Sequence, residues 1–356
     1  MPSEPAAATS PAPHSPLGLP PQVLCLGEAL VDRLGPPGGD PATDLPCDDR
    51  LGGAPANVAC GLARLGTPVA YLGRLGRDAI GDAFADLFAS RGVDTRALQW
   101  DDHRPSRIVL VRRDASGERS FEGFAGGAGA AGEAVFADQA LESEGLSAAL
   151  GPLLAPARWL LVGTIPLASA AAASALQLAC REAAAAGVAL ALDVNWRPTF
   201  WEASADPASG PGPEAIAAMR PLLEQAALIK CAREEAEWLF GSADAAAVSA
   251  ALPQRPAVVV SDGGSHLSWC FGGLSGDLPA FPVTVADSTG AGDAFTAGLL
   301  HRLCAEPALL AAADPQPVVA ALRFAAACGA LVCQGAGAID PQPDPAQVEA
   351  FLVAQA

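Results

Sequence analysis

The stretch DSTGAGDAF, residues 287–295, decides the fold of this chain. Its turn, Gly290-Ala291-Gly292, leads into a helix whose apolar residues keep a helical period until Pro307. Such a turn exposes backbone N–H groups, and the helix dipole adds positive potential, so an anion can bind there without a lysine. Asp293 lies in the first helical turn, where a carboxylate can accept the proton of an attacking hydroxyl. The stretch therefore predicts a phosphate site with a catalytic base, although an acidic residue also suits this position for purely structural reasons.

The overall composition excludes several classes of protein. The chain has a single lysine, Lys230, so it cannot contain a P-loop, which ends in Gly-Lys-Ser or Gly-Lys-Thr. The formal net charge is −18 without a basic cluster, which argues against nucleic acid and anionic lipid as partners. No uninterrupted apolar run approaches the roughly 18 residues of a membrane span. The four histidines show no zinc-site spacing.

The compartment follows from the cysteines and the N-terminus. Nine scattered cysteines, mostly set in apolar runs, are typical of free thiols in a reducing compartment. Residues 1–20 are rich in Pro, Ala and Ser and have no signal-peptide pattern. We therefore expect a cytoplasmic protein with a disordered tail over 1–20 and one folded domain over 21–356.

The rest of the chain alternates between short apolar strands and helices, several of which end at glycine. We predict strands over 23–26, 69–72, 159–162, 188–194 and 258–260, and helices over 57–65, 79–90 and 168–186. The many alanines in the helices favour close packing on a flat sheet. This alternation predicts an α/β fold, a three-layer αβα sandwich with a mostly parallel central sheet.

One segment interrupts this rhythm. Residues 106–124 alternate between polar and apolar side chains on both sides of a turn, which predicts a β-hairpin. Together with 33–51, the segment 104–125 is expected to form a small β lid over the edge of the sheet. A lid with free strand edges favours a homodimer. A G-x-G-x-x-G match at Gly127–Gly132 lacks a preceding buried strand, so a dinucleotide site is a weak alternative.

Motifs near the N-terminus accompany the glycine-rich turn: GEALVD at 27–32, GGAPAN at 52–57 and GRLGRD at 73–78. Together with DSTGAGDAF, which departs only at Ser288 from D-T-x-G-A-G-D-x-F, they resemble the two signatures of the PfkB, or ribokinase-like, carbohydrate kinases. The resemblance covers about residues 22–340. It implies a ribokinase-like sandwich with a β lid, ATP as phosphoryl donor, Mg²⁺, and a sugar hydroxyl as acceptor.

The resemblance also implies a sugar site in which Asp32 and Asn57 hold the hydroxyls, since a carboxylate and an amide can pair with neighbouring donors and acceptors. Gly52 and Gly53 would let the backbone approach the sugar. Arg197, near the carboxyl edge of the sheet, is a reasonable phosphate clamp. The alternative is that Asn57 merely caps a helix.

On the nucleotide side, the resemblance implies contacts from Ser261, Gly263 and Gly264, which are similar to the family's T-x-G loop. A plain hairpin turn is the alternative interpretation. Asp193 and Asn195 lie at the end of another predicted strand, at the edge where α/β sheets bind ligands. We therefore expect both beside the nucleotide.

Two metal sites are implied by the resemblance. Glu235 aligns with the glutamate of the family's N-x-x-E element, which orders Mg²⁺ and its waters, although Ala232 replaces the asparagine. The alternative is that Glu235 belongs to a solvated helix face. Asp287, with the carbonyl groups of 335–337, is expected to hold a monovalent cation such as K⁺.

The substrate is inferred from two strings. GGAPANVA at 52–59 and DVNWRPTFW at 193–201 are most similar to the fructokinases, which implies D-fructose as the acceptor at its 6-hydroxyl. The alternatives are ribose, 2-keto-3-deoxygluconate or a nucleoside such as adenosine. A catalytically inactive family member is a further alternative, but the base and the turn are both intact.

The lid does not match the fructokinase pattern. Residues 124–129 stand where plant-type fructokinases have an arginine-containing segment similar to FYRNPSADM. Arg107, Arg112 and Arg119 are candidates to replace that arginine. The sequence alone leaves the choice among the three open.

Overall fold

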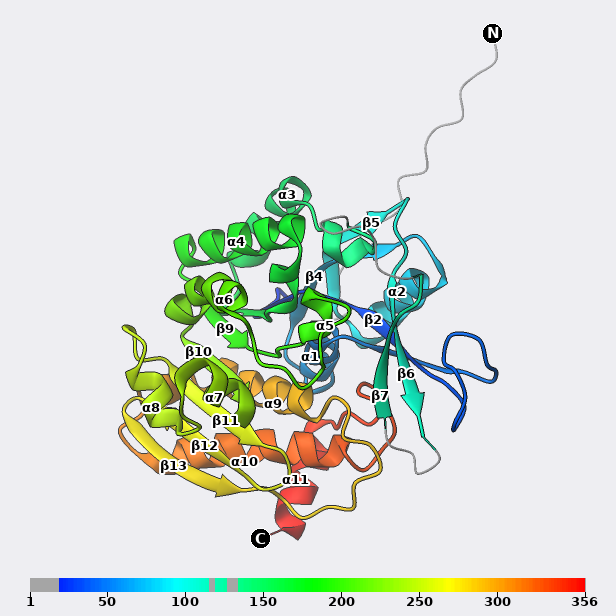
Figure 1. Cartoon of the computed structure of the whole chain (residues 1–356). Coiled ribbons are helices and arrows are strands. Elements are labelled where there is room, and N and C mark those ends of the chain that lie inside the picture. The colour runs from blue at the N-terminus through cyan, green and yellow to red at the C-terminus, as the bar shows by residue number, and fades with distance from the viewer. Residues whose placement is uncertain (1–18, 115–118, 127–133, 356) are drawn as a thin grey trace.

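The computed structural model describes residues 19–114, 119–126 and 134–355 (Figure 1). The predicted tail as far as residue 18, the turn at 115–118 and the whole Gly127–Gly132 pattern therefore lie outside the described residues.

A nine-stranded sheet forms the centre of the molecule. In spatial order its strands are β13 (Leu274–Pro279), β12 (His266–Phe271), β11 (Ala257–Asp262), β10 (Leu228–Ala232), β9 (Ala189–Asp193), β8 (Trp159–Val162), β1 (Val23–Leu26), β4 (Val69–Gly76) and β5 (Asp94–Asp101). All neighbouring strands from β11 to β5 pair in parallel, whereas β12 and β13 form an antiparallel edge. The predicted mostly parallel α/β sheet is confirmed.

Helices cover both faces of this sheet (Figure 1). One face carries α1 (Ala54–Arg64), α2 (Ala79–Arg91), α9 (Ala291–Ala305), α10 (Pro315–Val332) and α11 (Pro345–Ala354); the other carries α3 (Ser143–Leu154), α4 (Ala170–Ala185), α6 (Pro213–Gln225), α7 (Arg233–Phe240) and α8 (Ala245–Ala250). The β1 side chains alternate between the two layers, because Val23 and Cys25 belong to one core and Leu24 and Leu26 to the other. A strand buried on both faces reads as a continuous apolar run, which explains why the sequence pattern located the strand.

The connections contain four short elements. They are α5 (Pro198–Trp201), η1 (Ala137–Ala140), η2 (Ile165–Ala168) and η3 (Pro307–Ala311). Three of them, α5, η1 and η2, lie around the pocket described below.

A second, four-stranded sheet has the order β3-β2-β6-β7. Its strands are β2 (Leu30–Leu34), β3 (Asp48–Gly52), β6 (Arg107–Arg113) and β7 (Arg119–Phe124). The predicted hairpin is confirmed as β6 and β7, and β2 pairs in parallel with β6. This sheet contains parts of both segments expected to form a lid, and it extends from the body beside α1 and α2 (Figure 1). Its function as a lid stays a prediction.

One helix, α10, is long and apolar enough to cross a membrane by length and composition alone. Half of it is buried within the structure, where it packs against α9 and α11. Its buried side chains, such as Leu322 and Phe324, belong to the core on that face of the sheet. We therefore interpret α10 as a core helix of the α/β fold.

Candidate active site

The turn before α9 is built around Gly290. Gly290 is the N-cap of α9 and has a φ of 78°, in the left-handed region that favours glycine. A β-carbon at this position would collide with Ala338. Ala291 and Gly292 begin the helix, and Asp293 lies in its first turn. The structure thus has the glycine-rich turn at a helix N-terminus, as the sequence predicts.

Asp293 is bound by a side chain that is distant in the sequence. Asn57, on α1, donates a hydrogen bond from Nδ2 to Asp293 Oδ2 at 2.7 Å. Asn57 is only 4% exposed, and within the described part of the chain its Oδ1 is buried without a hydrogen-bond partner. An unpaired buried acceptor costs about 1–3 kcal/mol, so this atom fits a ligand that donates a hydrogen bond.

The environment of Asp293 also changes its acidity. Burial raises the pKa of its carboxyl above the ordinary value, and the negative charge of Asp193 adds to this rise. The hydrogen bond from Asn57 and the positive charges of Lys230 and Arg197 act in the opposite direction. Because burial dominates, Asp293 is a stronger proton acceptor than an ordinary aspartate.

The only lysine of the chain lies against the turn. Lys230, on β10, contacts both carboxylate oxygens of Asp193 at 3.0 and 3.2 Å, and its Nζ lies 2.9 Å from the position that a β-carbon of Gly292 would occupy. Thr296 of α9 donates to the same Asp193 at 3.0 Å. Lys230 was not predicted as a site residue, because it lies in the middle of β10 and its closeness to Gly292 depends on how β10 and α9 meet.

Negative charge dominates around Lys230. Burial alone would lower the pKa of its ammonium, but Asp193, Asp293 and Glu235 outweigh that effect and raise the pKa. The ammonium therefore stays charged beside the turn.

Glu235 is a buried capping group. Its Oε1 accepts a hydrogen bond from the Trp196 N–H at 2.6 Å, and its Oε2 accepts one from the Ala232 N–H at 2.7 Å. The side chain is 6% exposed, so the alternative of a solvated helix face is wrong for this residue. Asn195 has a φ of 42°, a backbone conformation that asparagine tolerates. It directly precedes Trp196, whose N–H donates the hydrogen bond to Glu235. The role of Glu235 toward Mg²⁺ stays a prediction.

Of two other predicted residues, Arg197 lies on the connection before α5 and Ser261 lies on β11. Arg197 donates to the Trp196 carbonyl at 2.8 Å, and its charge lowers the pKa of Asp293. Ser261, at the end of β11, donates to the Cys231 carbonyl at 3.4 Å. Gly263 and Gly264 belong to the turn that joins the antiparallel strands β11 and β12. This segment is therefore a hairpin turn, and its contact with a nucleotide stays a prediction.

The predicted sugar residues Asp32, Gly52 and Gly53 lie where the four-stranded sheet meets the body. Asp32, on β2, is directly opposite Arg50 on β3. Gly52 ends β3, and Gly53 is the N-cap of α1, the helix that carries Asn57. Asp32 lines a cavity of about 180 Å³ that also reaches the segment before the α9 turn.

Asp287, two residues after an exposed valine, is surrounded by hydrogen-bond donors. Its Oδ2 accepts from Arg50 Nη1 and from the Gly337 N–H, both at 3.0 Å. Its Oδ1 accepts from the backbone N–H and the hydroxyl of Thr289 at 3.0 and 2.7 Å. The Asp287 side chain is 3% exposed. The residue predicted to hold a monovalent cation is thus already paired with an arginine.

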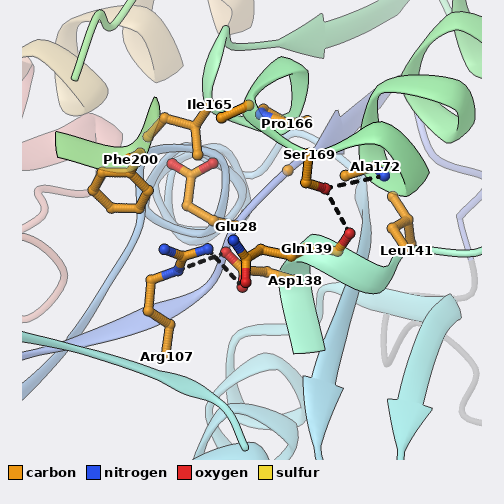
Figure 2. Close-up of a pocket in the computed structure, with 12 residues that line it drawn as sticks. Glu28, Arg107, Asp138, Gln139, Leu141, Ile165, Pro166, Ser169, Ala172 and Phe200 are labelled. Carbon is orange, nitrogen blue, oxygen red and sulfur yellow. Dashed lines mark hydrogen bonds and ion pairs between the residues drawn. The ribbon is translucent and has the colours of Figure 1, made fainter. Parts of the chain in front are cut away.

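A second buried ion pair lies beside a small pocket (Figure 2). Arg107, on β6, forms two hydrogen bonds of 2.9 and 3.1 Å with Asp138 of η1, and both side chains are at most 6% exposed. The Arg107 guanidinium also lies 4.7–4.9 Å from the ring centroids of Phe124, Phe136 and Phe200. Such contacts stabilise a cation that has lost its water.

Of the three arginines proposed for the lid, Arg107, Arg112 and Arg119, one lines this pocket. Its cavity of about 20 Å³ has room for about one water molecule and is lined by Arg107, Glu28 and Asp138 among others. Arg112 pairs with Glu122 near the surface, and the side chain of Arg119 lies outside the described part of the chain. Among the described candidates, Arg107 is therefore the arginine whose charge is buried.

Glu28 connects this pocket to the Asp293 site. It accepts a hydrogen bond from the Ala54 N–H in the first turn of α1, three residues before Asn57. Burial raises the pKa of Glu28 to about 8, and the charges of Asp138 and Asp293 contribute to that rise. The pocket and the catalytic candidates thus share the N-terminus of α1.

A parallel α/β sheet, a glycine turn at a helix N-terminus and a buried carboxylate beside it define a phosphotransferase with a ribokinase-like fold. The pfkB family carbohydrate kinase model matches residues 21–345. The chain therefore belongs to the pfkB family of carbohydrate kinases, enzymes that transfer a phosphoryl group to a hydroxyl.

Individual relatives agree with this family. A fructokinase from Klebsiella pneumoniae is 33% identical over 331 residues, which cover 90% of this chain and 96% of the relative. A fructokinase from Xylella fastidiosa, solved with bound ATP, has a TM-score of 0.77 and 30% identity over 94% of this chain and 98% of that chain. A double mutant of Vibrio cholerae O395 fructokinase, in its fructose, ADP and potassium ion bound form, has a TM-score of 0.73 and 26% identity over 93% of this chain and 98% of that chain.

Proposed function

We propose that this protein is a fructokinase that transfers the γ-phosphoryl group of ATP to the 6-hydroxyl of D-fructose, giving ADP and D-fructose 6-phosphate. The relatives that carry this name support the proposal. The observation that carries it is the Asn57–Asp293 pair, in which Asn57 Oδ1 lacks a partner within the described residues. A sugar hydroxyl can donate to Asn57 Oδ1 while the reacting hydroxyl reaches Asp293.

In the proposed reaction Asp293 is the general base. Its carboxylate takes the proton of the 6-hydroxyl while the hydroxyl oxygen forms a bond to the γ-phosphorus. The bond from that phosphorus to the β–γ bridging oxygen breaks, and the electron pair leaves with ADP. We assign the Gly290-Ala291-Gly292 N–H groups and the Lys230 ammonium to the negative charge of the transferred group.

The site's residues fit Mg²⁺ as a hydrated ion brought in with ATP. The negative charges of Asp193, Glu235 and Asp293 act on the single ammonium of Lys230, so the charge of this cluster favours a cation. Asp193 and Glu235 already accept hydrogen bonds from protein donors, and the described residues contain no group of three or more His, Cys, Asp or Glu side chains arranged to bind a metal directly. We infer that these two carboxylates would hold the ion through its waters, since Mg²⁺ usually keeps several. When bound, the ion would neutralise phosphate charge.

We infer further that the protein works in the cytoplasm as a homodimer formed through its four-stranded sheet. β3 and β7 are the edges of that sheet, and Leu45, in the loop between β2 and β3, is a largely exposed apolar side chain. Exposed strand edges favour pairing with another chain. Light scattering on the wild type and on Leu45→Glu tests this: we expect a dimer that the substitution weakens, and a monomeric wild type would contradict it.

The decisive measurement is kcat/KM for fructose, ribose, 2-keto-3-deoxygluconate, glucose and adenosine under identical ATP and Mg²⁺. We expect fructose to be preferred by about tenfold or more, because a sugar of the wrong configuration leaves the buried Asn57 Oδ1 without a donor, at a cost of about 1–3 kcal/mol. If another acceptor exceeded fructose tenfold, the family assignment would stand and the fructokinase proposal would fail.

A further inference from the structure

The carboxylate of Asp287 is a buried charge that needs a positive partner. Its side chain is 3% exposed and lies three residues before Gly290, at the entrance to the phosphate turn. Removing a carboxylate from water costs several kcal/mol unless a cation or hydrogen-bond donors compensate for it. A monovalent ion between Asp287 and the 335–337 loop is one way to supply that charge, and a potassium ion is part of the Vibrio cholerae structure described above.

In this chain Arg50 bonds Asp287 and lines the same cavity as Gly337. Its Nη1 donates to Asp287 Oδ2 at 3.0 Å. Its Cδ and Nη1 lie 3.6 and 3.9 Å from the position that a β-carbon of Gly337 would occupy. The guanidinium therefore lies beside Asp287 and Gly337, in the cavity that both of them line.

The guanidinium is also held from the other side. Arg50 Nε donates to Asp48 Oδ2 at 2.9 Å, and Nη2 donates to the same oxygen at 2.5 Å. Asp287 in turn accepts four hydrogen bonds from Arg50, Gly337 and Thr289. An ion could coordinate this carboxylate only by displacing one of these donors, each of which is attached to the chain.

We propose that Arg50 takes the place of a monovalent cation beside Asp287, so that phosphoryl transfer by this protein does not depend on K⁺. The inference rests on the proposed kinase function and identifies Arg50 as a positioning residue for the phosphate turn. Arginine suits this role because its guanidinium stays charged and its fork of donors holds a fixed geometry. Arg50 lies opposite Asp32 and two residues before Gly52, so the same side chain ties the predicted sugar strands to the turn.

The first test needs no variant. Turnover of the wild type with ATP, Mg²⁺ and fructose should change less than about twofold when KCl is replaced by tetramethylammonium chloride at equal ionic strength. Its melting temperature should be the same in both salts. Activation of the wild type by K⁺ of tenfold or more would overturn the proposal.

The second test is the gain of a potassium requirement. In tetramethylammonium, the kcat of Arg50→Ala should be about tenfold or more below that of the wild type. This loss is smaller than the loss expected on removing a direct transition-state donor. Adding K⁺ should restore much of the lost kcat. K⁺, but not tetramethylammonium, should also raise the melting temperature of this variant. A folded Arg50→Ala that ignores K⁺ in both measurements would overturn the proposal.

Arg33→Ala is the matched control. Arg33 pairs with Asp49 on the neighbouring positions of the same two strands, at 2.6 and 2.7 Å, near the surface. This variant should keep the salt response of the wild type, and a potassium requirement in it would contradict the assignment to Arg50. A chain without kinase activity on any sugar in any salt would instead defeat the proposed function, while the melting temperatures would still decide the role of Arg50.

Discussion

The α9 turn and the four-stranded sheet contribute to the same site in different ways. The turn is encoded within the residues 287–295, and its shape depends on Gly290 and on the helix that follows. The sheet contributes charges whose partners lie elsewhere: Arg50 binds Asp287, which is 237 residues away in the sequence. The comparison teaches that the candidate reacting groups, the turn and Asp293, are specified locally, whereas the groups that contact them are specified by tertiary pairing.

Replacing the proposed base, Asp293, should have the largest effect on activity, and this effect should be confined to kcat. Asp293→Asn removes the proton acceptor but can keep a hydrogen bond to Asn57, so we expect kcat to fall by roughly 10²–10⁴-fold with fructose binding nearly unchanged. Steady-state kinetics and calorimetric titration of fructose measure the two quantities. Near wild-type turnover in the pure variant would refute the base assignment.

Replacing the lysine should affect the turn less strongly. Lys230→Gln removes the ammonium that lies beside Gly292 and leaves Asp193 with Thr296 as a partner. We expect kcat/KM for ATP to fall by about 10–100-fold, since one preorganised charge near a phosphate is lost. The KM for fructose should change little. An equal fall in kcat/KM for ATP and for fructose would contradict this, because it would mean that the whole edge of the sheet has moved.

On the other side of the comparison, breaking the buried pair of the four-stranded sheet should reduce stability more than chemistry. Arg107→Met leaves the Asp138 carboxylate buried without its partner, which costs about 3–5 kcal/mol in comparable pairs. We expect the melting temperature to fall by several degrees and the KM for fructose to rise, with a smaller change in kcat. The double variant Arg107→Met/Asp138→Leu removes both charges and should recover much of the stability. A double variant no more stable than Arg107→Met would contradict this interpretation.

Replacing Glu28, which lies between the two regions, should have the smallest effect, a change in how stability depends on pH. Glu28 has an ordinary pKa of 4.5 when unfolded, and burial raises its pKa to about 8 in the fold. Between these values the folded chain keeps a proton that the unfolded chain releases, so the Glu28 contribution to stability is complete below pH 4.5 and is lost as pH rises to about 8.

Glu28→Gln should remove this dependence. Its melting temperature relative to the wild type should rise by a few degrees between pH 5 and pH 8, and thermal melts across this range measure the difference. Glu214→Gln, at an exposed site on α6, is the matched control. An advantage of Glu28→Gln that does not change with pH would contradict the buried ionisation.

The sequence was sufficient for features that arise from short segments. The run Val23–Leu26 and the other apolar strands predicted the parallel sheet, because strands buried on both faces have continuous apolar side chains. The hairpin β6–β7 followed from alternation around a turn. In the candidate site, the same holds for the turn and for Asp293.

The remaining features depend on which strands become neighbours. The pairing of β2 with β6 brings residues 30–34 beside residues 107–111, and no local pattern encodes this choice. Glu235 was expected near a metal, but its two bonds to backbone N–H groups come from a connection about 40 residues earlier and from its own helix N-terminus. Lys230 was used only to exclude a P-loop, because its closeness to Gly292 requires β10 and α9 to meet.

The position of Lys230 has a practical consequence. Because the chain has one lysine, its only ε-amino group lies in the candidate active site, where the side chain is 13% exposed and its pKa is raised. Reagents that acylate lysines will find no lysine on the outer surface. Slow modification of Lys230 that ATP prevents would then report occupancy of the proposed phosphate site directly, without a competing signal from any other lysine.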